Sequence, residues 1–255
     1  MKKIKKQSAL VTGSAIRLGK DIALSLAENG YDIAIHCNSS VTVAEETAEE
    51  IRGLGSKCAI FQHDLRETNG MKKMMKQVLV LFPRLSVLVN SASAYTQASI
   101  MNTTPEVFDQ QFDVNIRAPF FMSQAFVKVV GRGNIINIID NKVGFNQFQY
   151  AAYLLAKKSL VDFTKMAALE FAPKVRVNAV APGVVLPAKT RSKEYIEWRK
   201  QSIPLRKQGA SKNITDAILS LLKNDFISGQ MLVVDGAENI AQVGKNASEF
   251  DQSKV

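Results

Sequence analysis

The sequence predicts an α/β fold in three layers, a doubly wound parallel sheet of about seven strands with helices on both faces. Short apolar runs of strand length alternate with longer segments that carry apolar residues at helical spacing. Two of the runs, residues 85–89 and 135–139, are almost wholly apolar, as expected for parallel strands buried on both faces. A chain of 255 residues gives one such domain an ample core, so we expect residues 1–255 to form a single unit.

The first predicted strand, residues 8–12, leads into a turn and then into a helix that ends near Asn29. The turn, residues 13–19, reads GSAIRLG. In Rossmann-type nucleotide sites, the backbone N–H groups of such a turn and the positive end of the next helix face a pyrophosphate. The turn residues that we expect to bind a dinucleotide are Gly13, Arg17, Leu18 and Gly19.

The second predicted strand, residues 31–36, ends at the position that decides between NAD and NADP. A carboxylate there would bind the ribose 2′-hydroxyl of NAD and repel a 2′-phosphate. This chain reads HCNSS over residues 36–40, and its next carboxylate is Glu45. These groups, together with nearby Arg17, suit the phosphate of NADPH, although a serine could equally cap the next helix. The expected cofactor residues are His36, Asn38, Ser39 and Ser40.

Residues 41–95 are predicted to form further alternating helices and strands. An amphipathic helix over residues 41–54 ends at glycines, and a strand over residues 58–63 follows. Asp64 then precedes a helix over residues 66–81 and could cap it. After the strand at residues 85–89, a polar turn reads NSASAY over residues 90–95.

A long helix is expected to start after Thr104, a residue type that caps helices. Pro105 suits the first turn, and Glu106 lies near the positive helix end. Further along, Asn115 is a poor helix former and Pro119 removes a backbone hydrogen bond. Local faults of this kind are expected at functional sites.

A tyrosine and a lysine follow the fifth predicted strand. That strand ends at Asp140, whose carboxylate would point into the crevice where parallel sheets bind ligands. After an irregular loop at residues 141–149, Tyr153 and Lys157 lie four apart on a helix and share one face. A neighbouring ammonium favours phenolate, so we expect Lys157 to lower the pKa of Tyr153 and to make it a proton donor.

The rest of the chain completes the sheet. A strand over residues 175–179 leads to the turn at Pro182 and Gly183, and a long segment, residues 184–208, follows. A helix near residues 211–222 and a last strand over residues 230–234 follow. The tail, residues 241–255, is polar, and we expect it to be frayed or bound at an interface.

In this order and spacing, the motifs from Thr12 to Gly236 resemble the short-chain dehydrogenase/reductase family. The tyrosine and lysine have the family spacing, and residues 12–19 resemble its pattern T-G-x-x-x-G-x-G. Arginine replaces the middle glycine of that pattern, a polar turn with Tyr95 replaces N-N-A-G, and Asp140 replaces a serine. All three departures are typical of the pteridine reductases within the family.

The resemblance assigns further roles by position. It places Asp64 at the adenine edge, Asn115 beside a water relay behind Lys157, and Tyr95 above the nicotinamide. It makes residues 184–208 a substrate lid, where Trp198 either closes the pocket or contacts another subunit, and it implies a homotetramer. Its remaining cofactor contacts fall on Leu65, Asn90, Ser91, Ala92, Ser93, Lys157, Pro182 and Gly183.

The composition excludes several other classes of protein. The net charge is +10 with a pI near 9.6, but the lysines are scattered and no aromatic-plus-basic motif indicates nucleic-acid binding. No apolar run approaches the ~20 residues of a membrane span, and the basic start lacks the apolar core of a signal peptide. Two cysteines form neither a disulfide framework nor a metal site, so we expect a cytoplasmic protein without metal.

The function that we predict is NADPH-dependent reduction of a C=N bond in a pterin, dihydropterin or dihydrofolate. Tyr153 would donate the proton, Lys157 would assist it, and Asp140 would orient the substrate and help carry the proton. The remaining substrate contacts would be Arg17, Ser93 and Tyr95. One alternative is a carbonyl reductase of the same family that acts on 3-oxoacyl carriers or ketones. Another is a non-catalytic NADPH sensor, which we would expect to lack Tyr153 or Lys157.

Overall fold

The computed structural model describes residues 6–187 and 192–241, and it forms one seven-stranded parallel sheet in the order β3-β2-β1-β4-β5-β6-β7. The chain adds strands outward from β1 to β3, then returns to β4 on the other side of β1 and continues to β7. This is the predicted doubly wound α/β fold. It places a crevice at the carboxyl ends of β1 and β4, where the order in which the chain adds strands reverses. The strands are β1 Gln7–Val11, β2 Tyr31–Cys37, β3 Cys58–Gln62, β4 Leu85–Asn90, β5 Gly133–Ile138, β6 Val175–Pro182 and β7 Met231–Val234.

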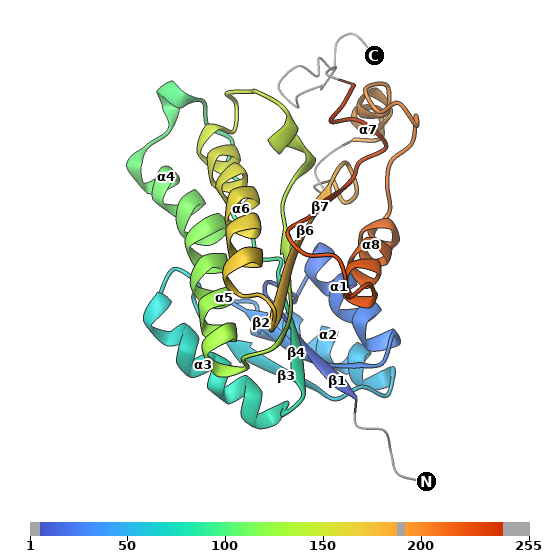
Figure 1. The fold of residues 1–255 in the computed structure, drawn as a ribbon. Helices are drawn as coiled ribbons and strands as arrows, with labels where there is room; N and C mark the ends of the chain where they lie inside the picture. Colours follow the sequence, from blue (N-terminus) through green and yellow to red (C-terminus); the bar gives the residue numbers. More distant parts are fainter. Residues whose placement is uncertain (1–5, 188–191, 242–255) are drawn as a thin grey trace.

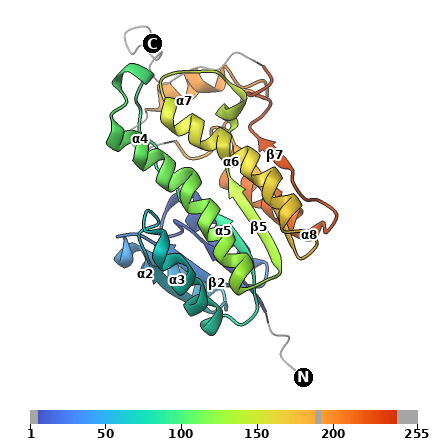
Figure 2. The same ribbon diagram turned by 60° about the vertical axis from the view of Figure 1, so that its left-hand side comes forward.

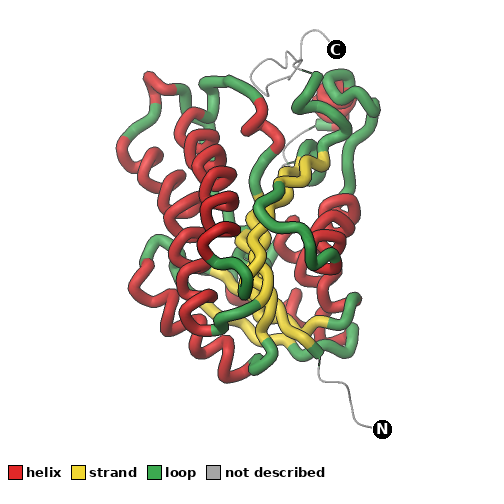
Figure 3. The backbone as a smooth tube through the Cα atoms, viewed as in Figure 1, coloured by secondary structure: helices red, strands yellow, loops and turns green. Residues whose placement is uncertain are grey.

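Helices cover both faces of the sheet, so the fold has the three expected layers (Figure 1). The apolar stripes of α1, α2 and α8 pack with one face of the sheet into one core, and those of α3, α5 and α6 pack with the other face into a second core. In the tube view the strands run between these two groups of helices (Figure 3). The helices are α1 Arg17–Glu28, α2 Val41–Gly53, α3 Thr68–Leu81, α4 Pro105–Phe112, α5 Ala118–Val129, α6 Ala151–Glu170, α7 Lys193–Lys200 and α8 Ser211–Lys223.

The predicted long helix after Thr104 is three consecutive segments. Thr104 caps α4 as expected, because its hydroxyl accepts a hydrogen bond from the Val107 N–H at 3.3 Å. A π-helical turn over Asp113–Arg117 then separates α4 from α5, which begins with Pro119 in its first turn. The poor helix former Asn115 therefore lies in the one π-helical turn of the described residues.

The expected lid segment, residues 184–208, contains a helix that was not predicted from the sequence. Ser192 caps α7 by accepting a hydrogen bond from the Tyr195 N–H, and α7 lies at the carboxyl end of the sheet (Figure 2). Trp198 of this helix packs against Tyr195, with ring centres 5.9 Å apart. The predicted tail lies outside the described residues from position 242 onward. In the part of the chain that the structure describes, no helix is long and apolar enough to span a membrane.

Candidate active site

A cavity of about 880 Å³ opens at the carboxyl ends of β1, β2, β4, β5 and β6. It extends from the end of β2 to the first turns of α6, and it brings together segments from the whole length of the chain. Most of the predicted site residues line it. These are Gly13, Arg17, Leu18, Gly19, His36, Asn38, Ser40, Asp64, Leu65, Ser91, Ala92, Ser93, Tyr95, Asp140, Tyr153, Lys157, Pro182 and Gly183.

The glycine turn is packed against the turn that follows β4. Gly13 has a φ of +64°, and a Cβ there would lie 2.8 Å from the Cα of Ala92, so no side chain fits. The Thr12 hydroxyl joins the two turns by accepting hydrogen bonds from the N–H groups of Ser91 and Ala92 at 3.0 and 3.1 Å. One wall of the cavity is therefore fixed by backbone contacts.

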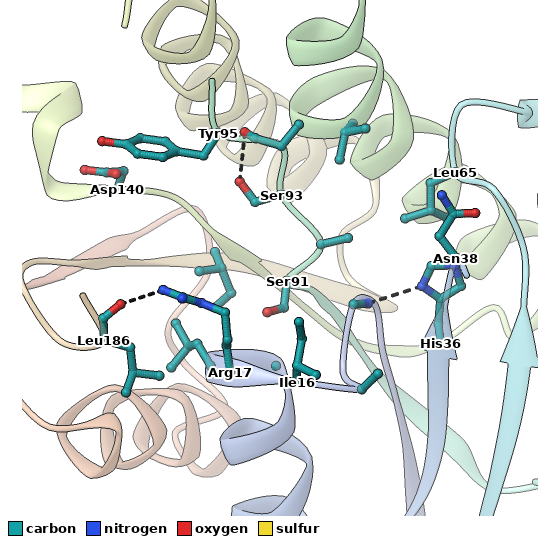
Figure 4. A pocket seen from close by; sticks show the side chains of 18 of the residues that line it. Ile16, Arg17, His36, Asn38, Leu65, Ser91, Ser93, Tyr95, Asp140 and Leu186 are labelled. Atoms are coloured by element: carbon teal, nitrogen blue, oxygen red, sulfur yellow. Dashed lines mark hydrogen bonds between the residues drawn. The ribbon is translucent and has the colours of Figure 1, made fainter. Parts of the chain in front are cut away.

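His36 is hydrogen-bonded to the glycine turn. Its buried ring accepts a hydrogen bond from the Gly13 N–H at Nδ1, 3.2 Å away, and the Nε2–H donates to the His63 carbonyl oxygen at 2.9 Å (Figure 4). This pair of bonds requires the neutral Nε2–H tautomer. Burial agrees with that state, because it lowers the pKa of His36 from 6.5 to about 4.

The lowered pKa of His36 predicts that the folded protein becomes less stable at acidic pH. Between pH 6.5 and about pH 4 the unfolded chain binds more protons than the folded protein, so the free energy of unfolding falls as the pH falls through this range. The full difference corresponds to about 3 kcal/mol. Urea denaturation at several pH values should show this loss, and His36→Asn should flatten it. His63→Gln, which changes the only other histidine, should keep the wild-type slope; an equal flattening would contradict the assignment.

Arg17 does not lie with the residues at the end of β2 that we expected to bind the phosphate of NADPH. Its guanidinium donates to the Leu186 carbonyl oxygen at 2.6 Å, and it extends away from Asn38 on the Asp140 side of the cavity (Figure 4). Arg17 also has a φ of +54°, a left-handed conformation that a side chain disfavours. A strained arginine that faces a cavity is a candidate ligand-binding residue.

The other residues near β2 and β3 also differ in part from the predictions. Ser40 lines the cavity and occupies the N-cap position of α2, but its side chain makes no capping hydrogen bond, and Ser39 does not line the cavity. Asp64 does not cap the next helix, because α3 starts at Thr68. Its carboxylate instead binds the Arg66 guanidinium, at 2.9 Å from Nε, which lowers the pKa of Asp64.

Asp140 and Tyr153 meet at the centre of the cavity wall. The Tyr153 hydroxyl donates to Oδ2 of Asp140 at 2.8 Å, and Oδ1 accepts from the Lys142 N–H at 2.8 Å. Asp140 therefore caps the short 3-10 helix Asn141–Gly144 with one oxygen and binds the tyrosine with the other. One side chain therefore both caps a helix and contacts Tyr153.

Lys157 lies next to Tyr153 but acts on it less directly than predicted. Its buried Nζ donates to the Ile138 carbonyl oxygen at 2.8 Å and is 5.9 Å from the centre of the Tyr153 ring. Burial lowers the pKa of Lys157 to about 8. The pKa of Tyr153 is raised, not lowered as we expected, because burial and the charge of Asp140 both disfavour the phenolate. Tyr153 is therefore a neutral phenol that carries its proton.

The site contains a third tyrosine, which was not predicted from the sequence. Tyr150 stacks on Tyr95 with ring centres 4.6 Å apart, and the rings of Tyr95 and Tyr153 form a T-shaped pair with centres 4.7 Å apart. The buried Tyr150 also donates from its hydroxyl to Gln97 at 3.2 Å. Its position three residues before Tyr153 is the signal that could have indicated a shared surface. One face of Tyr95 is thus covered by Tyr150, while half of its surface stays exposed.

Two predicted site residues, Asn90 and Asn115, lie behind the cavity wall. Asn90 is buried and donates to the Asn137 side chain at 2.8 Å, so it joins β4 to β5 and does not line the cavity. Asn115 donates to the Ala94 carbonyl oxygen at 2.9 Å and accepts from the Ser93 hydroxyl at 2.8 Å. Asn115 therefore supports the turn that carries Ser93 and Tyr95.

The family model described as enoyl-(acyl carrier protein) reductase matches residues 13–237. The chain is 32% identical to the 3-oxoacyl-(acyl-carrier-protein) reductase FabG of Staphylococcus epidermidis over 238 residues, which cover 90% of this chain and 98% of that protein.

Solved structures show the same architecture. The crystal structure of FolM alternative dihydrofolate reductase 1 from Brucella suis in complex with NADP has a TM-score of 0.88 and 30% identity, and the match covers 95% of this chain and 98% of that one. Acetoin dehydrogenase from Enterobacter cloacae has a TM-score of 0.83 and 29% identity, with 98% and 100% covered.

Proposed function

Because this chain belongs to the short-chain dehydrogenase/reductase family, we propose that it is an oxidoreductase that uses NADPH to reduce a pterin or folate. The observation that carries this proposal is the 2.8 Å hydrogen bond from Tyr153 to Asp140 beside the exposed ring of Tyr95. A carboxylate accepts hydrogen bonds from the ring N–H and amino groups of a pterin, and an aromatic face can stack on its flat ring. A simple ketone offers neither contact.

The residues of the cavity fit NADPH. The end of β2 presents His36, Asn38 and Ser40 to the cavity and no carboxylate, so a 2′-phosphate would meet the polar side chains of Asn38 and Ser40 without repulsion. At the other end, Lys157 lines the cavity and can bind ribose hydroxyls. The FolM reductase of Brucella suis, which shares the fold, was solved with NADP. The adenine contact of Asp64 and the contacts of the glycine turn belong to the same proposal.

In this mechanism, bound NADPH supplies a hydride to the carbon of a C=N bond. Tyr153 delivers a proton to the nitrogen: its O–H bond breaks as the new N–H bond forms. The buried Lys157, with a pKa of about 8, is charged at neutral pH and stabilises the phenolate that results. Asp140 holds the Tyr153 hydroxyl before the substrate binds; the hydroxyl then turns its hydrogen to the substrate nitrogen while Asp140 accepts hydrogen bonds from the substrate. Ser93, held by Asn115, and Arg17 complete the substrate side.

The strained conformation of Arg17 gives a separate test of its role. Arg17→Gly should leave the free energy of unfolding unchanged or raise it by up to about 1 kcal/mol, because glycine adopts a positive φ without strain. The same change should raise KM for a pterin about tenfold or more, since a hydrogen bond to a charged group contributes about 1.5–3 kcal/mol. Urea denaturation and steady-state kinetics measure the two effects. Unchanged KM in Arg17→Gly would remove Arg17 from the substrate site.

The proposal is tested by following NADPH absorbance with dihydropterin, dihydrofolate and acetoacetyl thioester in parallel. We expect consumption with a pterin or a folate and none with the thioester. The reverse result would favour the second candidate, a carbonyl reductase, to which the 32% identity with FabG points. Consumption with none of the three substrates, together with tight NADPH binding, would favour the non-catalytic sensor.

We also propose that the chain forms a homotetramer through α6 and β7. Three large apolar side chains of α6 are exposed in the single chain, as expected for a face that another subunit covers, and they are Leu155, Met166 and Leu169. Light scattering should give four times the mass of one chain. A mass of one or two chains would contradict the tetramer.

A further inference from the structure

A buried charged network joins α7 to the segment that follows β7. The Arg199 guanidinium on α7 lies 2.7 Å from Oε1 of Glu238, and both side chains are almost fully buried, with relative exposures of 4% and 2%. The Ser202 hydroxyl donates to the same carboxylate at 3.3 Å. Bringing these charges out of water is costly, so the pair persists only because the surrounding contacts hold it in a good geometry.

The network continues to the residue next to Asp140. The buried Asn141 amide donates to Oε2 of Glu238 at 3.0 Å and to Oδ2 of Asp235 at 3.1 Å. Both amide hydrogens of Asn141 are thus used. The two carboxylates that follow β7 therefore fix the direction of the peptide after Asp140. The Lys142 N–H, one residue on, is the donor that holds Oδ1 of Asp140.

We infer that Arg199, Glu238 and Asn141 are positioning residues for Asp140. Arg199 fixes the orientation of the Glu238 carboxylate, and Glu238 fixes the orientation of the Asn141 side-chain amide. Asn141 in turn fixes the conformation of the backbone that holds Asp140 against Tyr153. None of the three lines the cavity, so they act through Asp140 and not on the substrate. This inference rests on the proposed function in one respect, the role of Asp140 in turnover.

The geometry makes the effect of the network specific to turnover. Neutral Glu238→Gln keeps the side-chain volume but removes the charge that Arg199 binds, and Arg199→Met removes the donor. In both variants, we expect kcat to fall tenfold or more with the Kd for NADPH within twofold of the wild-type value, because Arg199 and Glu238 do not line the cavity. Arg199→Lys keeps the charge and should recover part of kcat. Lys200→Met, on the same helix but in the exposed pair with Glu197, is the matched control and should leave kcat unchanged.

A double-mutant cycle separates positioning from a general loss of structure. If Arg199 acts through Asp140, then adding Arg199→Met to Asp140→Asn should lower kcat less than twofold further, although Arg199→Met alone lowers it tenfold. A purely structural effect would lower kcat by the same factor in both backgrounds. Equal factors would therefore overturn the inference.

Hydrogen exchange tests the same inference without a substrate. In Glu238→Gln and Arg199→Met, the amides of residues 140–144 should exchange at least tenfold faster than in the wild type, while those of β1 keep their rates. Unchanged exchange over residues 140–144 in both variants would overturn the inference, even if Arg199→Met folds too poorly for kinetics. Failure of the proposed function has a different signature, namely a wild-type protein with protected amides at 140–144 that leaves pterins and folates unreduced.

Discussion

Tyr153→Phe should lower kcat about a thousandfold while NADPH still binds with nearly its wild-type affinity. The change removes the hydroxyl whose oxygen lies 2.8 Å from Oδ2 of Asp140, and general acid catalysis by one side chain contributes about 10²–10⁴-fold. Phenylalanine keeps the ring that packs in a T-shaped arrangement with Tyr95, so the shape of the cavity is preserved. Single-turnover kinetics and fluorescence titration of NADPH measure the two quantities separately.

Tyr150→Phe is the matched control for this prediction. It removes a phenolic hydroxyl three residues away, one that binds Gln97 and not Asp140, and it keeps the stack on Tyr95. We expect its kcat to stay within about threefold of the wild-type value, since only a peripheral hydrogen bond is lost. If Tyr153→Phe and Tyr150→Phe had similar kcat values near that of the wild type, another group would be the proton donor.

The sequence predicted the fold and the placement of Asp140 and Tyr153 at one crevice, because both depend on local pattern. Alternating strand and helix segments define a doubly wound sheet, and the carboxyl ends of its strands converge on one crevice. Asp140 closes one of these strands, and the four-residue spacing brings Lys157 to the same helix face as Tyr153. Residues at such ends can be assigned to a site before any coordinates are known.

Features that depend on contacts between distant segments were not predictable in the same way. Arg17 binds a carbonyl oxygen 169 positions away, and Glu238 binds both Arg199 and Asn141. The raised pKa of Tyr153 results from burial by the assembled site, which the spacing to Lys157 does not reveal. Tyr150 differs, since its separation from Tyr153 by three residues was visible and only its stack on Tyr95 was not.

Asp140→Ser is expected to exchange one substrate class for another. The variant restores the hydroxyl that the family usually has at this position, so Tyr153 and the serine could both donate hydrogen bonds to a ketone oxygen. A pterin would lose the carboxylate that accepts from its N–H groups, and charged hydrogen bonds of this kind contribute about 1.5–3 kcal/mol each. We expect kcat/KM for the pterin to fall about a hundredfold, and we expect reduction of acetoacetyl thioester to become detectable.

Asp140→Asn distinguishes the charge of this side chain from its shape. Its Oδ1 can still accept from the Lys142 N–H, so the cap of the short helix Asn141–Gly144 is preserved. If the carboxylate charge binds the substrate, Asp140→Asn should lose pterin turnover nearly as fully as Asp140→Ser, without gaining the thioester, because its other atom presents an amide and not a hydroxyl. Full pterin activity in Asp140→Asn would mean that Asp140 serves only as a helix cap. The departure from serine would then carry no information about the substrate.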